Sequence, residues 1–150
     1  MKLVTACLLV LFLVQTIALA GLDTEIQQTN RVILPHGDWK PDEKDTQNPL
    51  TAVQAFLEKP THTRPPEADT IQQILRDAKH YRVQFRGTLL QKRRVIFCNF
   101  FHAPHPIQKD PFPGWRQEQV DFDDGGACFW HIYYDPSTDK CLGFESNGYG

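Results

Sequence analysis

Apolar residues recur at two different spacings along this chain. Over residues 49–58, and again from about residue 68, they fall every three or four positions, which predicts two short helices. Asn48 followed by Pro49 marks the first start, because Asn is a common N-cap and proline suits the first helical position. Prolines between the two segments prevent one continuous helix.

Beyond residue 80 the apolar spacing shortens to two, the period of a β-strand. Tyr81, Val83 and Phe85 alternate with polar neighbours, which predicts a half-buried strand. Residues 95–101 are almost continuously apolar and β-prone, as in a central strand covered on both faces. The remaining strands are expected in three further β-prone runs, at 118–122, 128–134 and 141–146.

Two helices followed by a run of strands predict an α+β fold. We expect the helices to lie across one face of a curved antiparallel sheet of four to five strands joined by hairpins. Cystatin-like and NTF2-like folds share this layout and serve as architectural analogues, without carrying function over. Residues 48–150 would form this single domain. A mostly polar arm at 21–47 would precede it and tuck residues 32–34 and Trp39 onto the body.

The first twenty residues have the order of a secretory signal peptide. Lys2 gives a positive start, residues 3–19 form an apolar run, and Ala18 and Ala20 place small side chains at the −3 and −1 positions. We therefore expect a signal peptide at 1–20, cleaved after Ala20, and a secreted or periplasmic mature protein. A retained membrane anchor is the alternative, but no charged flank follows the apolar run.

The net charge of the chain argues against two classes of partner, nucleic acids and anionic membranes. The formal net charge of −2 and the pI near 6.3 provide no long-range field that would attract nucleic acid or an anionic membrane. The one basic cluster, Lys92 to Arg94, falls at an expected hairpin turn and is too small for a nucleic-acid site. We expect no nucleic-acid partner, and no membrane contact once the signal peptide is removed.

Three cysteines remain in the expected mature chain: Cys98, Cys128 and Cys141. Export to an oxidising compartment favours one disulfide and one free thiol. In a tight hairpin Cys141 lies opposite about Tyr134, roughly six residues from Cys128 and beyond disulfide reach. We therefore expect a disulfide that includes Cys98 and either of the others, with reduced core thiols as the alternative.

The cysteines and histidines suggest two kinds of chemistry to consider, metal binding and nucleophilic catalysis. Cys98, His102 and His105, with Cys128 and His131 on a neighbouring strand, are zinc or copper ligand types. Their spacing fixes no common geometry, so no metal site is predicted. A nucleophilic cysteine would need a lowered thiol pKa, whereas the apolar run around Cys98 raises it. Structural cysteines and loop histidines are the preferred interpretation.

An acidic turn offers a third possible site. Asp121, Asp123 and Asp124 precede two glycines, as oxygen ligands do in calcium loops, but the bidentate Glu that completes such loops is missing. Acidic residues before a Gly-Gly pair are also ordinary hairpin chemistry. We expect a turn and predict no cofactor.

Several short segments of the C-terminal third carry a resemblance to known proteins. They are Gly114-Trp115-Arg116, Asp123-Asp124-Gly125-Gly126, Phe129-Trp130, Tyr133-Tyr134-Asp135 and Asn147-Gly148. This part of the chain is similar to a group of small exported bacterial proteins with no assigned activity. The resemblance implies an exported bacterial protein and brings no catalytic residues with it.

We interpret the chain as a small exported, non-catalytic binding module. Phe112 and Trp115, on the proline-rich loop from Pro104 to Trp115, are expected to face solvent and anchor an unknown protein or small apolar ligand. The open face of the sheet, which includes His131, would extend this binding surface.

Two other functions remain as alternatives. The first is a small-pocket enzyme, in which His131 or His102 acts as base with one of Asp121, Asp123 and Asp124. It requires a polar pair enclosed in a cavity, and no sequence spacing establishes that pair. The second is a weak metal-binding protein built from the cysteines, histidines or acidic turn described above.

Overall fold

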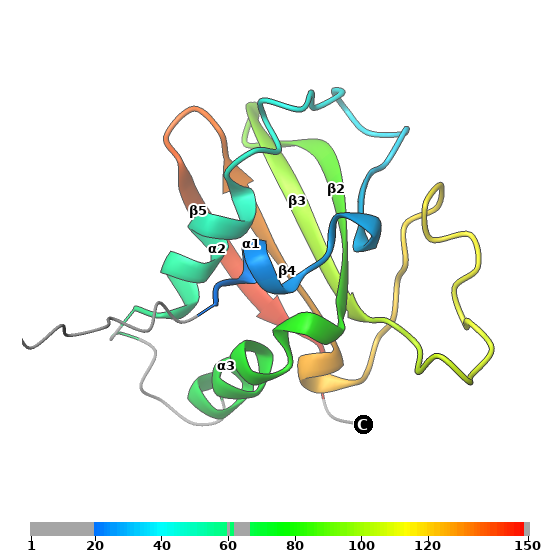
Figure 1. Cartoon of the computed structure of the whole chain (residues 1–150). Coiled ribbons are helices and arrows are strands. Elements are labelled where there is room, and N and C mark those ends of the chain that lie inside the picture. Colours follow the sequence, from blue (N-terminus) through cyan, green and yellow to red (C-terminus); the bar gives the residue numbers. More distant parts are fainter. Residues whose placement is uncertain (1–19, 60, 62–66, 149–150) are drawn as a thin grey trace, which may run out of the picture.

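The computed structural model describes residues 20–59, 61 and 67–148 of the chain. They form an α+β fold, in which helices pack on one face of an open five-stranded sheet (Figure 1). The expected signal peptide lies outside the described residues except for Ala20. No helix of the described part is long and apolar enough to cross a membrane.

Both predicted helices are confirmed, and a short third one precedes them. The helices are α1 (Leu22–Glu25), α2 (Pro49–Leu57) and α3 (Glu67–Arg76), with 3-10 turns at Gln28–Asn30, Ala78–His80 and Gly126–Cys128. The Asn48 side chain makes no cap hydrogen bond, so the start of α2 depends on Pro49 and on backbone bonding. Each helix turns its apolar residues towards the sheet.

The sheet contains β1 (Arg31–Ile33), β2 (Tyr81–Leu90), β3 (Arg93–His102), β4 (Phe129–Asp135) and β5 (Lys140–Ser146), in that spatial order. Strands β2 to β5 form the predicted antiparallel meander. Strand β1 pairs parallel to β2, so the sheet is mixed and not wholly antiparallel. The parallel pairing is possible because the chain between β1 and β2 includes α2 and α3, a long crossover connection.

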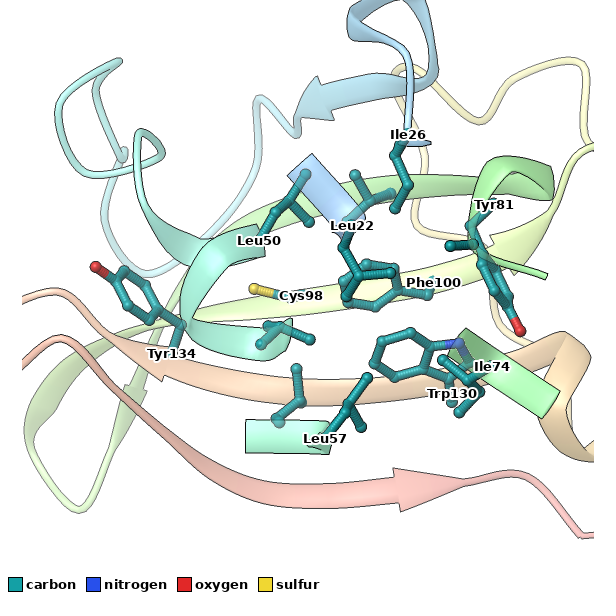
Figure 2. Packing of buried hydrophobic residues seen from close by; sticks show 14 of the residues in the cluster. Leu22, Ile26, Leu50, Leu57, Ile74, Tyr81, Cys98, Phe100, Trp130 and Tyr134 are labelled. Carbon is teal, nitrogen blue, oxygen red and sulfur yellow. The ribbon is translucent and has the colours of Figure 1, made fainter. Parts of the chain in front are cut away.

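The main core lies between the helices and the sheet (Figure 2). Alternate residues of each strand enter it, and Phe100 of β3 stacks on Trp130 of β4 with ring centroids 3.8 Å apart. The Tyr81 hydroxyl, also buried there, donates to the Ala127 carbonyl over 2.6 Å. The alternation predicted from Tyr81 to Phe85 therefore faces this core.

Residues 21–47 contribute more to the core than a polar arm would. Leu22 and Ile26 are both 0% exposed within the main core. Trp39 packs at its edge, as expected, and its indole nitrogen donates to the Thr88 carbonyl over 3.0 Å. Gly87 permits this approach, since a Cβ there would lie 2.1 Å from the Trp39 carbonyl oxygen.

The opposite face of the sheet carries a second, smaller core. Phe101, Trp115 and Val120 are buried in it, and Val32, Phe112 and Phe129 pack around them. The loop between β3 and β4 therefore folds back over one end of the sheet instead of projecting into solvent. Both faces of β3 are covered at this end, as its continuous apolar run predicted.

The expected strand at 118–122 is absent, and a buried amide pair explains why. The Gln84 side chain donates to the Glu118 carbonyl (2.7 Å) and accepts from the Val120 amide (3.0 Å). Asn99, beside it on β3, donates to the Val120 carbonyl (2.8 Å) and to Gln84 Oε1 (3.0 Å). Two side chains thus satisfy the backbone groups that a neighbouring strand would otherwise have paired.

Candidate functional site

The two aromatic residues expected to anchor a partner do not face solvent as predicted. Trp115 is only 5% exposed, between Phe101 (ring centroids 5.9 Å apart) and the Arg82 guanidinium (4.8 Å from its ring). Phe112 is half-buried and contacts Phe101 at 5.7 Å. The expected exposure is wrong for Trp115, and Phe112 is only partly exposed, because the amides of Gln84 and Asn99 hold this loop on the sheet. These aromatics stabilise the fold.

His131, the third expected binding residue, does lie on the open side of the sheet. Its side chain is 22% exposed, and its Nε2 is 3.3 Å from Oε2 of Glu145 on β5. Burial lowers the pKa of His131, while Glu145 acts in the opposite direction. The imidazole is therefore mostly neutral at pH 7 and can donate a hydrogen bond to the carboxylate.

Four side chains gather around His131 on this face. Arg86, Phe97 and Tyr133 occupy neighbouring positions across β2, β3 and β4, one row from the His131–Glu145 pair. The Phe97 ring is central, with centroid distances of 5.0 Å to His131, 5.4 Å to Tyr133 and 5.2 Å to the Arg86 guanidinium carbon. We call these five residues the aromatic face.

A bulge in β5 helps to place Glu145 on the aromatic face. Two β5 residues, Gly143 and Phe144, lie opposite Ile132 alone, and Gly143 adopts φ +57°. The extra residue lets Phe144 point into the main core while Glu145 still faces His131. Glycine suits this position because a side chain there would strain the left-handed backbone.

Arg86 is the member of the aromatic face with an unmet bonding requirement. Its Nε is buried and, among the described residues, has no hydrogen-bond partner. The Asp38 carboxylate is near enough for Arg86 to help lower its pKa. That carboxylate accepts from the Leu89 amide and the Thr88 hydroxyl, both through Oδ2 at 2.9 Å, and forms no ion pair with Arg86 among the described residues. Arg86 is thus a cation without a bound carboxylate in the described part of the chain.

The expected disulfide does not form in this structure, where all three described cysteines are free. Cys141 lies opposite Tyr134, as predicted, which keeps it far from Cys128. Cys98 and Cys141 are on β3 and β5 with β4 between them and lie opposite different β4 residues, so their Cα atoms are at least about 10 Å apart, beyond the ~7 Å limit. The sequence alone did not show that β4 lies between β3 and β5, so it did not exclude this pair.

The cysteines are also poor nucleophiles. Burial raises the pKa of all three thiols, that of Cys141 to about 12. Asp77 raises the pKa of Cys128 further. A thiolate would need the reverse, a nearby positive charge and a lowered thiol pKa.

A histidine cluster that the sequence did not predict lies at the end of β3. The His102 ring is 4.6 Å from the Tyr81 ring and 6.5 Å from the His80 ring, and Asp77 is its nearby acid. Burial lowers the pKa of His102, with His80 adding to the effect and Asp77 opposing it. Asp77 and His80 could have been found only from the turn that ends α3, which brings them beside β3.

Neither His131 nor the acidic turn has the arrangement that the alternative functions require of it. The carboxylate partner of His131 is Glu145, which is 72% exposed and not enclosed in a cavity. The acidic residues of the expected turn, Asp121, Asp123 and Asp124, are all exposed. Within the described ranges, no group of three or more His, Cys, Asp or Glu side chains converges as a metal site requires.

Cavities in the structure lie away from the aromatic face. One of about 520 Å³ borders β1 and includes Arg31, whose guanidinium already pairs with Asp23 at 2.8 Å. A smaller one, about 290 Å³, follows the loop around Trp115. A third, about 570 Å³, lies between α2 and β5. The aromatic face itself is a surface without an enclosed pocket among these three.

Comparison with protein-family models, curated proteins and solved structures finds no match to this chain. The function therefore has to be inferred from its own residues and their arrangement.

Proposed function

We propose that this protein is a small exported binding module, without catalytic activity, that docks a partner protein on the aromatic face. The observation that carries the proposal is the grouping of Arg86, Phe97, His131 and Tyr133 on the side of the sheet away from the helices. Arginine and tyrosine are enriched among the residues that dominate protein–protein binding energies.

The shape of the aromatic face favours a protein over a small apolar ligand. A small ligand gains affinity by burying most of its surface in a concave pocket, and none of the three cavities includes these residues. A surface patch that lies outside these cavities can instead be covered by a second protein surface. Its side chains project from hydrogen-bonded strands, so little conformational entropy is lost on binding.

The chemistry of the face indicates what the partner presents. Partly exposed Tyr133, beside the buried Phe97 ring, offers apolar contact, and the Arg86 guanidinium offers a positive charge that has no bound carboxylate among the described residues. A partner surface carrying an acidic side chain beside an apolar one would satisfy both. Glu145 disfavours a second acid on its own side of the face and so helps to orient the partner.

Charge reversal at Arg86 tests this function. Tagged wild-type protein and the Arg86→Glu variant are used to capture partners from envelope extracts of the native host, and the bound proteins are quantified. We expect one or more proteins to bind the wild type and to be lost, about tenfold or more, from Arg86→Glu, since truncating or reversing an interface charge costs at least about 1.4 kcal/mol.

Arg94→Glu is the matched control, because Arg94 is an exposed β3 arginine that lies over the Trp39 ring on the other side of the sheet. It should keep full capture. Equal capture by all three proteins, at matched melting temperatures, would contradict the proposal. Equal loss in both variants would indicate a general effect of charge and would also contradict it.

Export is part of the same proposal and is supported by the signal-like first twenty residues. Cleavage after Ala20 would keep Gly21, whose carbonyl accepts the first hydrogen bonds of α1, and the buried Leu22. The mature chain would then retain every core residue described here, in a secreted or periplasmic compartment.

A further inference from the structure

A second candidate binding site lies between α2 and β5. These two elements are neighbours at the helical side of the sheet (Figure 1). Helix α2 crosses β5 there and leaves a cavity of about 570 Å³, which we call the α2–β5 groove. That volume is within the range of natural small-molecule sites, roughly 300–1,000 Å³. None of the residues of the aromatic face lines the groove.

The floor of the α2–β5 groove is apolar. Ala52, Ala55 and Phe56 line it from α2, and Cys141 and Leu142 line it from β5. The alanines leave room between helix and strand that larger side chains would fill. Phe56 also contacts Phe144 at 6.5 Å, which joins the floor to the main core. An apolar body can therefore replace water along this floor.

The rim of the groove carries two lysines. No described carboxylate lies within ion-pair distance of Lys59 or Lys140. The Lys59 ammonium is 5.1 Å from the Phe56 ring centroid, over the floor. Burial raises the pKa of the Cys141 thiol to about 12, and Lys59 acts in the opposite direction, which places its charge near Cys141.

The rim also carries one acid, Asp139, which is hydrogen-bonded. Asp139 accepts a hydrogen bond from the Tyr134 hydroxyl over 2.8 Å. Counting Lys59 and Lys140 against Asp139, the rim has a formal excess of one positive charge. A ligand with one negative charge complements that excess, while a cation would meet two ammonium groups.

From this combination of cavity, floor and rim, we propose that the α2–β5 groove binds a small amphiphilic carboxylate, with its apolar body along the floor and its carboxylate between Lys59 and Lys140. Aliphatic and aromatic carboxylates share this chemistry. The proposal is independent of the partner proposed for the aromatic face, and either could fail without the other.

Titration of the folded protein with matched probes tests the groove. Decanoate and naphthalene-2-carboxylate serve as the aliphatic and aromatic anions, and decylammonium is the cation with the same apolar body as decanoate. Binding is followed by amide chemical shifts in two-dimensional NMR spectra. We expect at least one anion to shift the amides of residues 51–59 and 139–142, and the cation to leave them unchanged.

Variants then test the charges. Lys59→Glu and Lys140→Glu should each weaken anion binding about tenfold, because each replaces an attraction by a repulsion. Lys109→Glu, the same change at an exposed lysine of the β3–β4 loop, should leave the affinity unchanged. The ratio of decanoate to naphthalene-2-carboxylate affinities reports which apolar body the floor prefers.

Three results would overturn the proposal. Neither anion shifts the groove amides, or decylammonium shifts them equally, or Lys59→Glu and Lys140→Glu bind as tightly as Lys109→Glu. If a lysine variant fails to fold, the wild-type titration repeated at high salt replaces it. Rising salt should then weaken anion binding, and affinity that does not change with salt would count against the two lysines.

Discussion

At the scale of single residues, burial decides what each aromatic side chain does. Trp115 and Tyr133 are both large aromatics on the side of the sheet away from the helices. Trp115 is covered by the loop that carries it, whereas Tyr133 remains half-exposed on β4. We therefore expect Trp115 to stabilise the fold and Tyr133 to contact the proposed partner.

The role of Trp115 can be measured by truncation. Trp115→Ala should lower the free energy of unfolding by about 3–5 kcal/mol, the usual loss for a buried Trp or Phe. Ile107→Ala is the control on the same loop, since Ile107 is 89% exposed and its loss should stay within about 0.5 kcal/mol. Urea unfolding compares the two. A Trp115→Ala protein as stable as Ile107→Ala would mean that the second core is not formed.

Two partly buried histidines, His102 and His131, predict how stability depends on pH. The pKa values of His102 and His131 are lowered from 6.5 in the folded protein, so the unfolded chain binds these protons more tightly. The free energy of unfolding should fall as pH drops below about 6.5, until the folded-state pKa values are passed.

Urea midpoints at pH 7.5 and 5.5 measure this effect. The double variant His102→Gln and His131→Gln should lose part of the acid sensitivity, whereas His36→Gln, at an exposed position, should keep it. If the wild type, the double variant and His36→Gln all lose the same stability between pH 7.5 and 5.5, groups other than His102 and His131 are responsible.

At the scale of elements, hydrophobic spacing predicted the parts that local patterns determine. The period-two pattern starting at Tyr81 and the dense apolar run of 95–101 became β2 and β3. The expected strand at 118–122 failed for a reason outside its own sequence, since Gln84 and Asn99 supply the hydrogen bonds there. Residues 31–33 became a strand only because the helical crossover lets them reach β2.

The candidate site, too, could be predicted only in part from the sequence. His131 was found because it interrupts a β-prone run, but its neighbours Arg86, Phe97 and Glu145 come from three other strands. Their meeting depends on strand order and on the bulge at Gly143, neither of which has a local signal strong enough to assign. Phe112 and Trp115 were predicted to face solvent because proline-rich loops commonly lie on the surface. The sequence does not show that this loop packs on the sheet.

Substitution of Gln84 tests whether the Gln84–Asn99 pair holds the β3–β4 loop on the sheet. Gln84→Ala removes hydrogen bonds to the Glu118 carbonyl and the Val120 amide and leaves buried backbone groups unpaired. We expect a loss of about 3 kcal/mol in the free energy of unfolding and faster protease cleavage within 103–125. Gln117→Ala, at an exposed position, is the control. Unchanged cleavage in Gln84→Ala would show that the loop is held by its aromatics alone.

At the scale of the whole molecule, the helices occupy one face of the sheet and leave the other partly open. The β3–β4 loop covers one end of that second face, and the aromatic face occupies the part beyond the Gln84–Asn99 pair. The α2–β5 groove lies on the helical side. A protein partner and a small anion would thus bind on opposite sides of one small domain.

Processing sets the limits of that domain. Intact mass of protein recovered from its native host should match a chain that begins at Gly21 or within a residue or two. Cleavage beyond Ile26 would remove two fully buried core residues and should yield an unstable product. A stable protein that retains residues 1–20 would contradict the export proposal.

Photo-crosslinking in the native host tests the central claim most directly. A photoreactive phenylalanine analogue at position 133 should form a crosslink to a distinct partner protein, and adding Arg86→Glu should abolish it. The same analogue at Gln72, exposed on α3 across the sheet, should not trap that partner. A partner trapped equally from both positions, or no partner trapped from position 133, would contradict docking on the aromatic face.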